Sequence, residues 1–401
     1  MSTADENKVE AENFAFFQEV FKKALLYRLS FVQREKENYE ALSHELPNFW
    51  EVVGQSYLQK HWTAVSAFRD ALQGFLDLQG YWTQSLALNQ WACEAARESG
   101  EVVNEIRWTH DRANILLQRG QNHEAETLYT FCEEKARSLG NIALALKSRN
   151  QRALCLRSQG RIAEAEQLCQ TTLDEARRLG LDRWIPPVLY TLSLFIRDQG
   201  DLKKAEQCVE EGLRLVDPTD IALIAHFHHS LGEIALLLGQ RDKARIHMEK
   251  SIQLSEQARV VRRIAATKRL LGDLERIEGH YQAAEKLYDE ALAIVSRIED
   301  LPVLARLLLS KAKLKLQMKH RHEGIALLRA AVAHYQKTGD ARTVGGVSLL
   351  LMVQYLRQGY IGQVILVGFN GLKVVLASDM LRPRVLFNFR RLRTWWYLLA
   401  S

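Results

Sequence analysis

The sequence has little proline and no cysteine pair of the CxxC type, and both absences narrow the fold classes. Six prolines in 401 residues are few for a loop-rich or all-β chain, which uses proline in its turns. The five cysteines form an odd set, typical of reduced and mostly buried thiols in a cytoplasmic protein. The polar, acidic start differs from a secretory signal, and no apolar run reaches the roughly 18 residues of a membrane-spanning helix. These absences favour a helical, cytoplasmic chain.

Sequence motifs of the common catalytic and cofactor sites are also missing. The chain has no GxxxxGK(S/T) phosphate loop, no GxGxxG turn, no HExxH or GxSxG motif and no EF-hand loop. We therefore expect a protein that is not an enzyme and that holds no cofactor.

Charge is weak overall and unevenly distributed. The formal net charge is +6, too small over this length to indicate a nucleic-acid partner. From residue 301 onward there are 16 Lys and Arg against 3 Asp and Glu, so the last part carries +13 and the first 300 residues −7. The useful feature is therefore a basic C-terminal end.

Glycine recurs at an almost constant interval through most of the chain. The interval is 39 or 40 residues, and Lys319 occupies the one missing place in the series Gly80, Gly120, Gly160, Gly200, Gly239, Gly279 and Gly359. Small residues stand five positions after these glycines, at Ser85, Ala125, Ala165, Ala205, Ala244 and Ala284. Small residues at fixed offsets mark close approaches of two helices, and glycine allows the tight turn between them. The pattern predicts repeats of two helices each.

This pattern resembles that of tetratricopeptide repeats. The packing positions of the family are matched in one unit by Leu271, Gly272, Gly279, Ala284 and Ala291. The period of about 40 residues exceeds the commonest value of about 34 and is similar to the repeat arm of bacterial signal-transduction ATPases. This chain has no ATPase module. The resemblance implies an all-α fold, an α-solenoid whose helix-turn-helix repeats wind into a right-handed superhelix.

We expect three regions along the chain. Residues 1–79 form an N-terminal helical capping region, and residues 80–358 form the repeat array. Residues 359–401 form an apolar and basic C-terminal capping or anchoring segment.

In the resembled family, the first helix of each repeat lines a concave groove that binds extended peptides or partner helices. The corresponding face of this chain is polar and mostly basic: Arg107, His110, Asn114, Lys147, Asn150, Arg157, Tyr190, Arg197, His226, His229, Glu233, Arg269 and Arg276. Such side chains suit carboxylates, so the expected partner is a protein or peptide of acidic character. A solvated helix face with ordinary surface charge is the alternative.

Three potential metal ligands lie close together in the sequence. His226, His229 and Glu233 share one helical face and are of the residue types that ligate zinc. One helix spreads them over two turns, about 10 Å, so a single ion meets at most two of them. We expect a polar groove face here and no metal site.

The last residues combine basic and aromatic side chains: Arg382, Arg384, Arg390, Arg391, Arg393, Trp395 and Trp396. Such a tail either packs on the last repeat or binds an anionic membrane surface, where each basic residue contributes about 1 kcal/mol. Stacking on nucleic acid is a minority interpretation.

These patterns favour a non-catalytic scaffold or adaptor that binds a partner protein or peptide in the concave groove of the solenoid. The first alternative is a regulatory sensor that responds to a ligand or peptide. The second is a metal-dependent hydrolase at His226 and His229. We expect a cytoplasmic protein, with peripheral membrane association through the tail as an open alternative.

Overall fold

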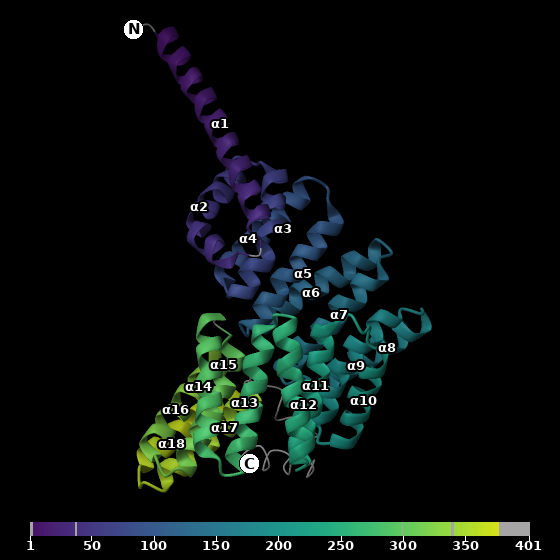
Figure 1. The fold of residues 1–401 in the computed structure, drawn as a ribbon, viewed down its shortest axis with the longest axis vertical. Coiled ribbons are helices and arrows are strands. Elements are labelled where there is room, and N and C mark those ends of the chain that lie inside the picture. Colours follow the sequence, from purple (N-terminus) through teal and green to yellow (C-terminus); the bar gives the residue numbers. More distant parts are fainter. Residues whose placement is uncertain (1–2, 37, 299, 338–340, 377–401) are drawn as a thin grey trace. The chain divides into compact units, whose positions relative to one another are not determined.

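The computed structural model describes residues 3–36, 38–298, 300–337 and 341–376, and in this part of the chain helices and short turns occur without any strand (Figure 1). The prediction of an all-α fold is confirmed for these residues. The chain divides into two compact units, Met1–Arg112 and Ala113–Ser401. None of the described helices combines the length and the apolar character that crossing a bilayer requires.

The first unit is built from long helices packed around aromatic and aliphatic side chains. Its helices are α1 (Thr3–Arg34), α2 (Tyr39–Leu58), α3 (Trp62–Gln79), α4 (Trp82–Glu98) and the larger part of α5 (Val102–Gln118), within which the division falls. Phe49, Phe68 and Leu72 are fully buried in its core. Earlier in the chain, Phe16 and Phe17 on α1 are exposed.

The second unit is an array of helix pairs, as the glycine interval predicts. The first helices of the pairs are α7 (Ile142–Ser158), α9 (Ile185–Asp198), α11 (Ile221–Leu237), α13 (Val261–Ile277), α15 (Leu301–Gln317) and α17 (Ala341–Leu356). The second helices are α6 (Asn122–Ser138), α8 (Ile162–Arg178), α10 (Leu202–Leu215), α12 (Arg241–Gln257), α14 (Tyr281–Ile298), α16 (Arg321–Lys337) and α18 (Ile361–Leu376). A short 3-10 helix, η1 (Asp182–Trp184), precedes α9.

The residue between the two helices of a pair adopts a left-handed backbone conformation. Gly279 between α13 and α14 has φ 86°, which costs glycine little because it has no Cβ. Lys319, which replaces glycine between α15 and α16, has φ 65° and adopts the same conformation despite its side chain. The missing glycine therefore does not interrupt the array.

The small residues mark the closest approaches between the paired helices. A Cβ added to Gly272 would lie 2.6 Å from Cε1 of Tyr288, and one added to Gly232 would lie 2.8 Å from Cγ of Met248. Ala284, five positions after the turn, is fully buried. Because the neighbouring side chains fill the space where a Cβ would stand, larger residues at these positions are excluded.

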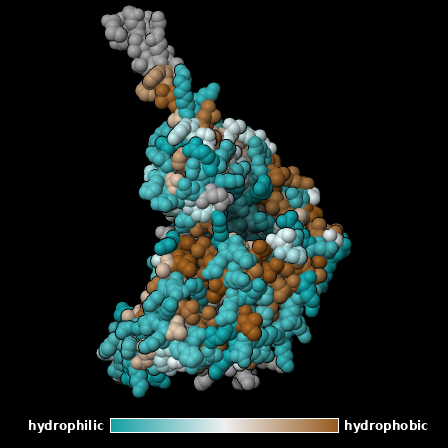
Figure 2. All heavy atoms as spheres, viewed as in Figure 1, coloured by the Kyte–Doolittle hydropathy of each residue, from teal (hydrophilic) through white to brown (hydrophobic). Residues whose placement is uncertain are grey.

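The core of the second unit continues from pair to pair along the array. Buried clusters follow one another along α7 to α11, α11 to α13, α13 to α15 and α15 to α18. The outer surface is mostly hydrophilic, with separate apolar areas (Figure 2). Ile361 and Ile365 on α18 are exposed.

The array of the second unit curves toward its first helices. Successive first helices from α7 to α15 contact one another, whereas successive second helices have at most marginal contacts. Elements that lie closer together on one side of a stack place that side on the inside of the bend. We call the side formed by α7, α9, α11, α13 and α15 the concave face.

Candidate functional site

The concave face carries a ladder of ion pairs that joins three first helices. Arg157 Nε on α7 lies 2.8 Å from Asp198 Oδ2 on α9, and Arg197 Nη2 lies 3.1 Å from Asp198 Oδ1. Arg197 also pairs with Glu233 on α11. Burial alone would raise the pKa of Glu233, but Arg197 and Arg269 outweigh it and hold this pKa below its usual value. Glu233 is therefore ionised and bound to arginine.

A second polar cluster joins α13 to its neighbours around one carboxylate. Arg269 Nη1 lies 2.7 Å from Asp273 Oδ2, and Ser310 Oγ on α15 donates to the same oxygen at 3.1 Å. The hydroxyl of Tyr288 on α14 donates to Asp273 Oδ1 at 2.8 Å. All these groups connect neighbouring helices, so the contacts of Arg269 stabilise the packing of the array.

Two helical turns before Arg197 and Glu233 on the same helices, Tyr190 and His226 form an aromatic platform. Their ring centroids are 5.6 Å apart, and the hydroxyl of Tyr190 accepts a hydrogen bond from Arg263 Nη2 at 3.4 Å. Burial, with the nearby Arg263 and Arg262, lowers the pKa of His226 well below its usual value. The imidazole is therefore neutral at pH 7 and contributes a flat, uncharged surface.

Several of the residues predicted to line the groove are buried and face neighbouring helices: His110, Asn150, His229 and Arg276. Asn150 accepts a hydrogen bond from Cys169 Sγ at 3.7 Å, and Arg276 Nη1 donates to Gln317 at 3.1 Å. These contacts correct their interpretation as open groove residues. The physical reason is that first helices pack on one another, so part of the polar face becomes helix interface.

The other predicted groove residues keep partial or full exposure: Arg107, Asn114, Lys147, Arg157, Tyr190, Arg197, His226, Glu233 and Arg269. Asn114, at the start of the second unit, accepts a hydrogen bond from the hydroxyl of Tyr129 at 2.6 Å. Lys147 on α7 is half-buried. Within the second unit, the structure thus brings together the predicted residues from Arg157 to Arg276 on consecutive first helices.

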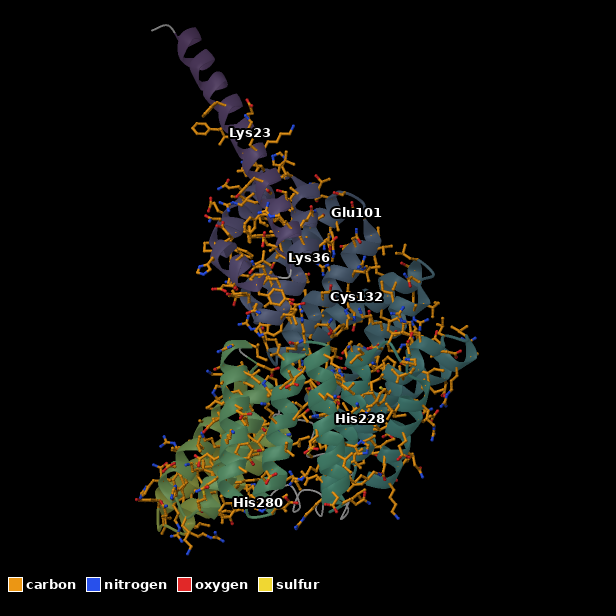
Figure 3. All side chains as sticks on the ribbon, viewed as in Figure 1. Lys23, Lys36, Glu101, Cys132, His228 and His280 are labelled. Atoms are coloured by element: carbon orange, nitrogen blue, oxygen red, sulfur yellow. The ribbon has the colours of Figure 1, made fainter. Side chains whose placement is uncertain are left out.

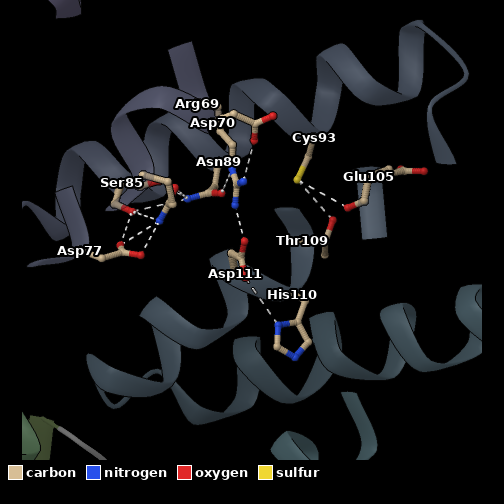
Figure 4. Close-up of polar contacts among 11 residues, drawn as sticks. Arg69, Asp70, Asp77, Ser85, Asn89, Cys93, Glu105, Thr109, His110 and Asp111 are labelled. Atoms are coloured by element: carbon tan, nitrogen blue, oxygen red, sulfur yellow. Dashed lines mark hydrogen bonds and ion pairs between the residues drawn. The ribbon is translucent and has the colours of Figure 1, made fainter. Parts of the chain in front are cut away.

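Arg107 and His110 belong to the first unit. Arg107 is exposed, whereas His110 is fully buried with its Nδ1 3.8 Å from Asp111 Oδ1 (Figure 4). Asp111 pairs with Arg69, whose Nε donates to Asn89 Oδ1 at 3.1 Å. This network crosses α3, α4 and α5 and has the character of a buried structural core.

The three potential metal ligands of α11 do not converge. His229 Nδ1 lies 2.8 Å from Thr267 Oγ1, the His226 ring lies tilted against that of Tyr190, and Glu233 pairs with Arg197. Each of these groups therefore has another role, and the hydrolase alternative has no ligand cluster at this place.

One group of three potential ligands is close enough to share an ion within the described residues: Glu275, Glu278 and His280. His280 is labelled in Figure 3. On α12, Arg245 Nη1 lies 2.5 Å from Glu275 Oε1, and Arg245 Nη2 lies 2.6 Å from Glu278 Oε2. One guanidinium bridges both carboxylates, so this cluster has the composition of an ion-pair network.

Sequence reasoning missed four basic residues of the concave face: Arg262, Arg263, Arg306 and Lys313. Arg306 and Lys313 stand 13 and 6 positions before Lys319, the same offsets at which His226 and Glu233 precede Gly239. Extending the repeat through the turn at Lys319 identifies Arg306 and Lys313 from the sequence. The residues proposed for the C-terminal tail, from Arg382 to Trp396, lie outside the described residues.

Comparison with known proteins identifies the repeat. Two models of the tetratricopeptide repeat match the chain, at residues 110–178 and 220–297. No curated protein matches it significantly.

Solved structures match over most of the chain at low identity. A Rap protein complexed with competence and sporulation factor is 12% identical with a TM-score of 0.57, covering 84% of this chain and 98% of that one. NprR in complex with its cognate peptide NprX is 16% identical with a TM-score of 0.55, covering 82% and 94%. The apo quorum sensor NprR from B. thuringiensis is 14% identical with a TM-score of 0.52, covering 90% and 99%. At these identities the likeness shows the fold alone.

Proposed function

We propose, starting from the fact that this chain is a tetratricopeptide-repeat protein, that it is a non-catalytic adaptor that binds a partner protein or peptide along its concave face. The observation that carries the proposal is the continuous polar strip on the first helices α7 to α15. Buried apolar clusters join the repeats, and on this strip ion pairs also hold the polar side chains in fixed positions. A preorganised polar surface lowers the entropic cost of binding.

Two structural neighbours support a peptide as the bound species. The NprR structure contains its cognate peptide NprX, and a Rap conjugation regulator of plasmid pLS20 was solved with the Phr* peptide. The latter has a TM-score of 0.58 and covers 69% of this chain. A sensor that responds to a peptide is therefore the second candidate function. It predicts that binding changes the curvature of the array, whereas a passive adaptor keeps its shape.

The test uses two substitutions that leave the ion-pair ladder intact. Lys147→Glu and Arg306→Glu change the charge of the concave face, and Lys203→Glu, on the exposed side of α10, is the matched control. Peptide-array binding should weaken about tenfold or more in the first two variants and remain unchanged in the control. Equal binding by all forms would refute the assignment to the concave face.

We propose a cytoplasmic location, with the basic C-terminal segment attaching the chain reversibly to anionic membranes. Supporting this, α18 at the start of that segment is strongly apolar and exposes Ile361, Ile365 and Leu366. An amphipathic basic segment next to an exposed apolar helix is typical of interfacial binding.

A further inference from the structure

Two arginines of the concave face have no carboxylate partner among the described residues. Arg263 on α13 donates only to the hydroxyl of Tyr190, and its Nε is buried without a hydrogen-bond partner in the described part of the chain. Arg306 on α15 donates only to the carbonyl oxygen of Pro302 in its own helix, at 3.3 Å. The neighbouring carboxylates are engaged elsewhere, since Asp300 pairs with Arg262.

Arg306 is exposed and lies near other cations of the concave face. The surrounding helices partly desolvate it and lower its pKa, and the nearby Arg269 and Arg262 lower it further, whereas Tyr335 and Glu233 act in the opposite direction. Neighbouring first helices therefore flank Arg306, and its open side faces solvent. A desolvated guanidinium gains most from an incoming anion.

We propose that Arg306 and Arg263 bind carboxylate groups of the peptide, so that the ligand of the concave face is an extended acidic segment. This inference rests on the proposed function and specifies its ligand. The two arginines lie on adjacent first helices, which pack about 8–10 Å apart, so one extended segment that crosses the face meets both. Carboxylates match the planar guanidinium with paired hydrogen bonds.

The aromatic platform supports this assignment. Tyr190 positions Arg263 through its hydroxyl while its ring rests on the neutral His226. The peptide backbone and apolar side chains can pack on this uncharged surface beside the two cations. Acidic groups of the array could compete for the cations, but Asp198 and Glu233 are already bound to Arg197.

The experiment uses the full chain and short fluorescein-labelled peptide pools read by fluorescence anisotropy. One pool carries Asp and Glu at alternate positions, a matched pool carries Asn and Gln there, and each pool is made with a free and an amidated C-terminus. The variants are Arg306→Gln, Arg263→Gln and Arg306→Lys. Arg321→Gln, exposed at the start of α16, is the control. Circular dichroism establishes that each variant is folded.

The wild type should bind the acidic pool about tenfold more tightly than the amide pool. Arg306→Gln and Arg263→Gln should each remove most of that preference, Arg306→Lys should keep part of it, and Arg321→Gln all of it. A loss of preference on amidation would assign the carboxylate to the peptide terminus. If peptides bind with no acidic preference, or the preference survives both glutamine variants, this inference is wrong while the proposed function stands. If no pool binds, the proposed function fails with it.

Discussion

The hydroxyl of Tyr190 on α9 accepts a hydrogen bond from Arg263 on α13, 73 positions further along the chain, at 3.4 Å. The contact spans the intervening helix α11, whose His226 lies against the ring of Tyr190. Three first helices therefore meet at one point of the concave face. A ligand bound there contacts three repeats at once and responds to any change in their mutual spacing.

Removing Arg197 should destabilise the array. Arg197→Met leaves Glu233 half-buried next to α9 without its arginine, and breaking a buried pair costs about 3 kcal/mol. Arg197→Met combined with Glu233→Gln should recover most of the loss, since the uncompensated charge disappears. Arg178→Met, on the exposed end of α8, is the control. Urea unfolding measures the effect, and equal midpoints for Arg197→Met and Arg178→Met would contradict it.

The two histidines of α11 that face the concave side and its helix contacts, His226 and His229, should make stability depend on pH. Burial lowers the pKa of His226 and His229 well below the usual value, so the unfolded chain binds more protons than the folded one at pH just below 6.5. Stability should therefore fall as the pH drops from about 6.5 to about 5, by about 1.4 kcal/mol per pH unit for each histidine. The lowered pKa of Glu233 acts only at more acidic pH.

The control for this pH dependence is His229→Gln, which retains a polar partner for Thr267. The thermal unfolding midpoint should depend less steeply on pH in the variant, because one of the two titrating histidines is absent. An unchanged slope would show that His229 does not titrate in the way described.

Close helix packing makes a prediction about glycine. Gly272→Ala should lower the free energy of unfolding by about 1–3 kcal/mol. The new Cβ would lie 2.6 Å from Cε1 of Tyr288 and displace this ring, whose hydroxyl donates to Asp273. Gly74→Ala, in an exposed position of α3 with no atom within 4 Å, should be neutral or stabilising by up to about 1 kcal/mol. The thermal unfolding midpoint should fall in Gly272→Ala and stay the same or rise in Gly74→Ala. Similar losses in both variants would rule out the packing explanation.

Membrane attachment has a separate test. The full chain should float with vesicles that contain anionic lipid, and a form ending at Leu381 should not. High salt should release the full chain, because the attraction of basic residues to headgroups is screened. Flotation of the shortened form to the same extent would show that the residues after Leu381 are not required for membrane binding.

Helix pairs and turns followed from the sequence because their causes are local. Glycine at a regular interval reports a left-handed turn, and small residues at fixed offsets report helix contact. Lys319 was recognised as occupying a glycine place, and its φ of 65° confirms this. The two-helix repeat is therefore predictable over residues 80–358, whereas α18, the second helix of the last described pair, falls in the region expected to be a capping or anchoring segment.

The candidate site was only partly predictable, because burial and pairing depend on the curvature of the array. Periodicity places Arg157, Arg197 and Arg276 on one face but does not show that Asp198 and Gln317 occupy them. Periodicity places Tyr190 on the groove face but does not connect it with Arg263, because their contact exists only where three helices curve together. Which arginines lack a carboxylate partner depends on which ones the acidic side chains of neighbouring helices reach.

Site-specific photo-crosslinking tests the central claim most directly. A benzophenone amino acid is introduced in place of His226 on α11, in place of the partly exposed Ala266 at the same repeat position on α13, or in place of the exposed Ile246 on α12. Each form is irradiated with the tightest peptide from the array. We predict adducts from the first two positions at about tenfold the level from the third. Adducts from position 246 alone, or equal adducts from all three, would contradict binding on the concave face.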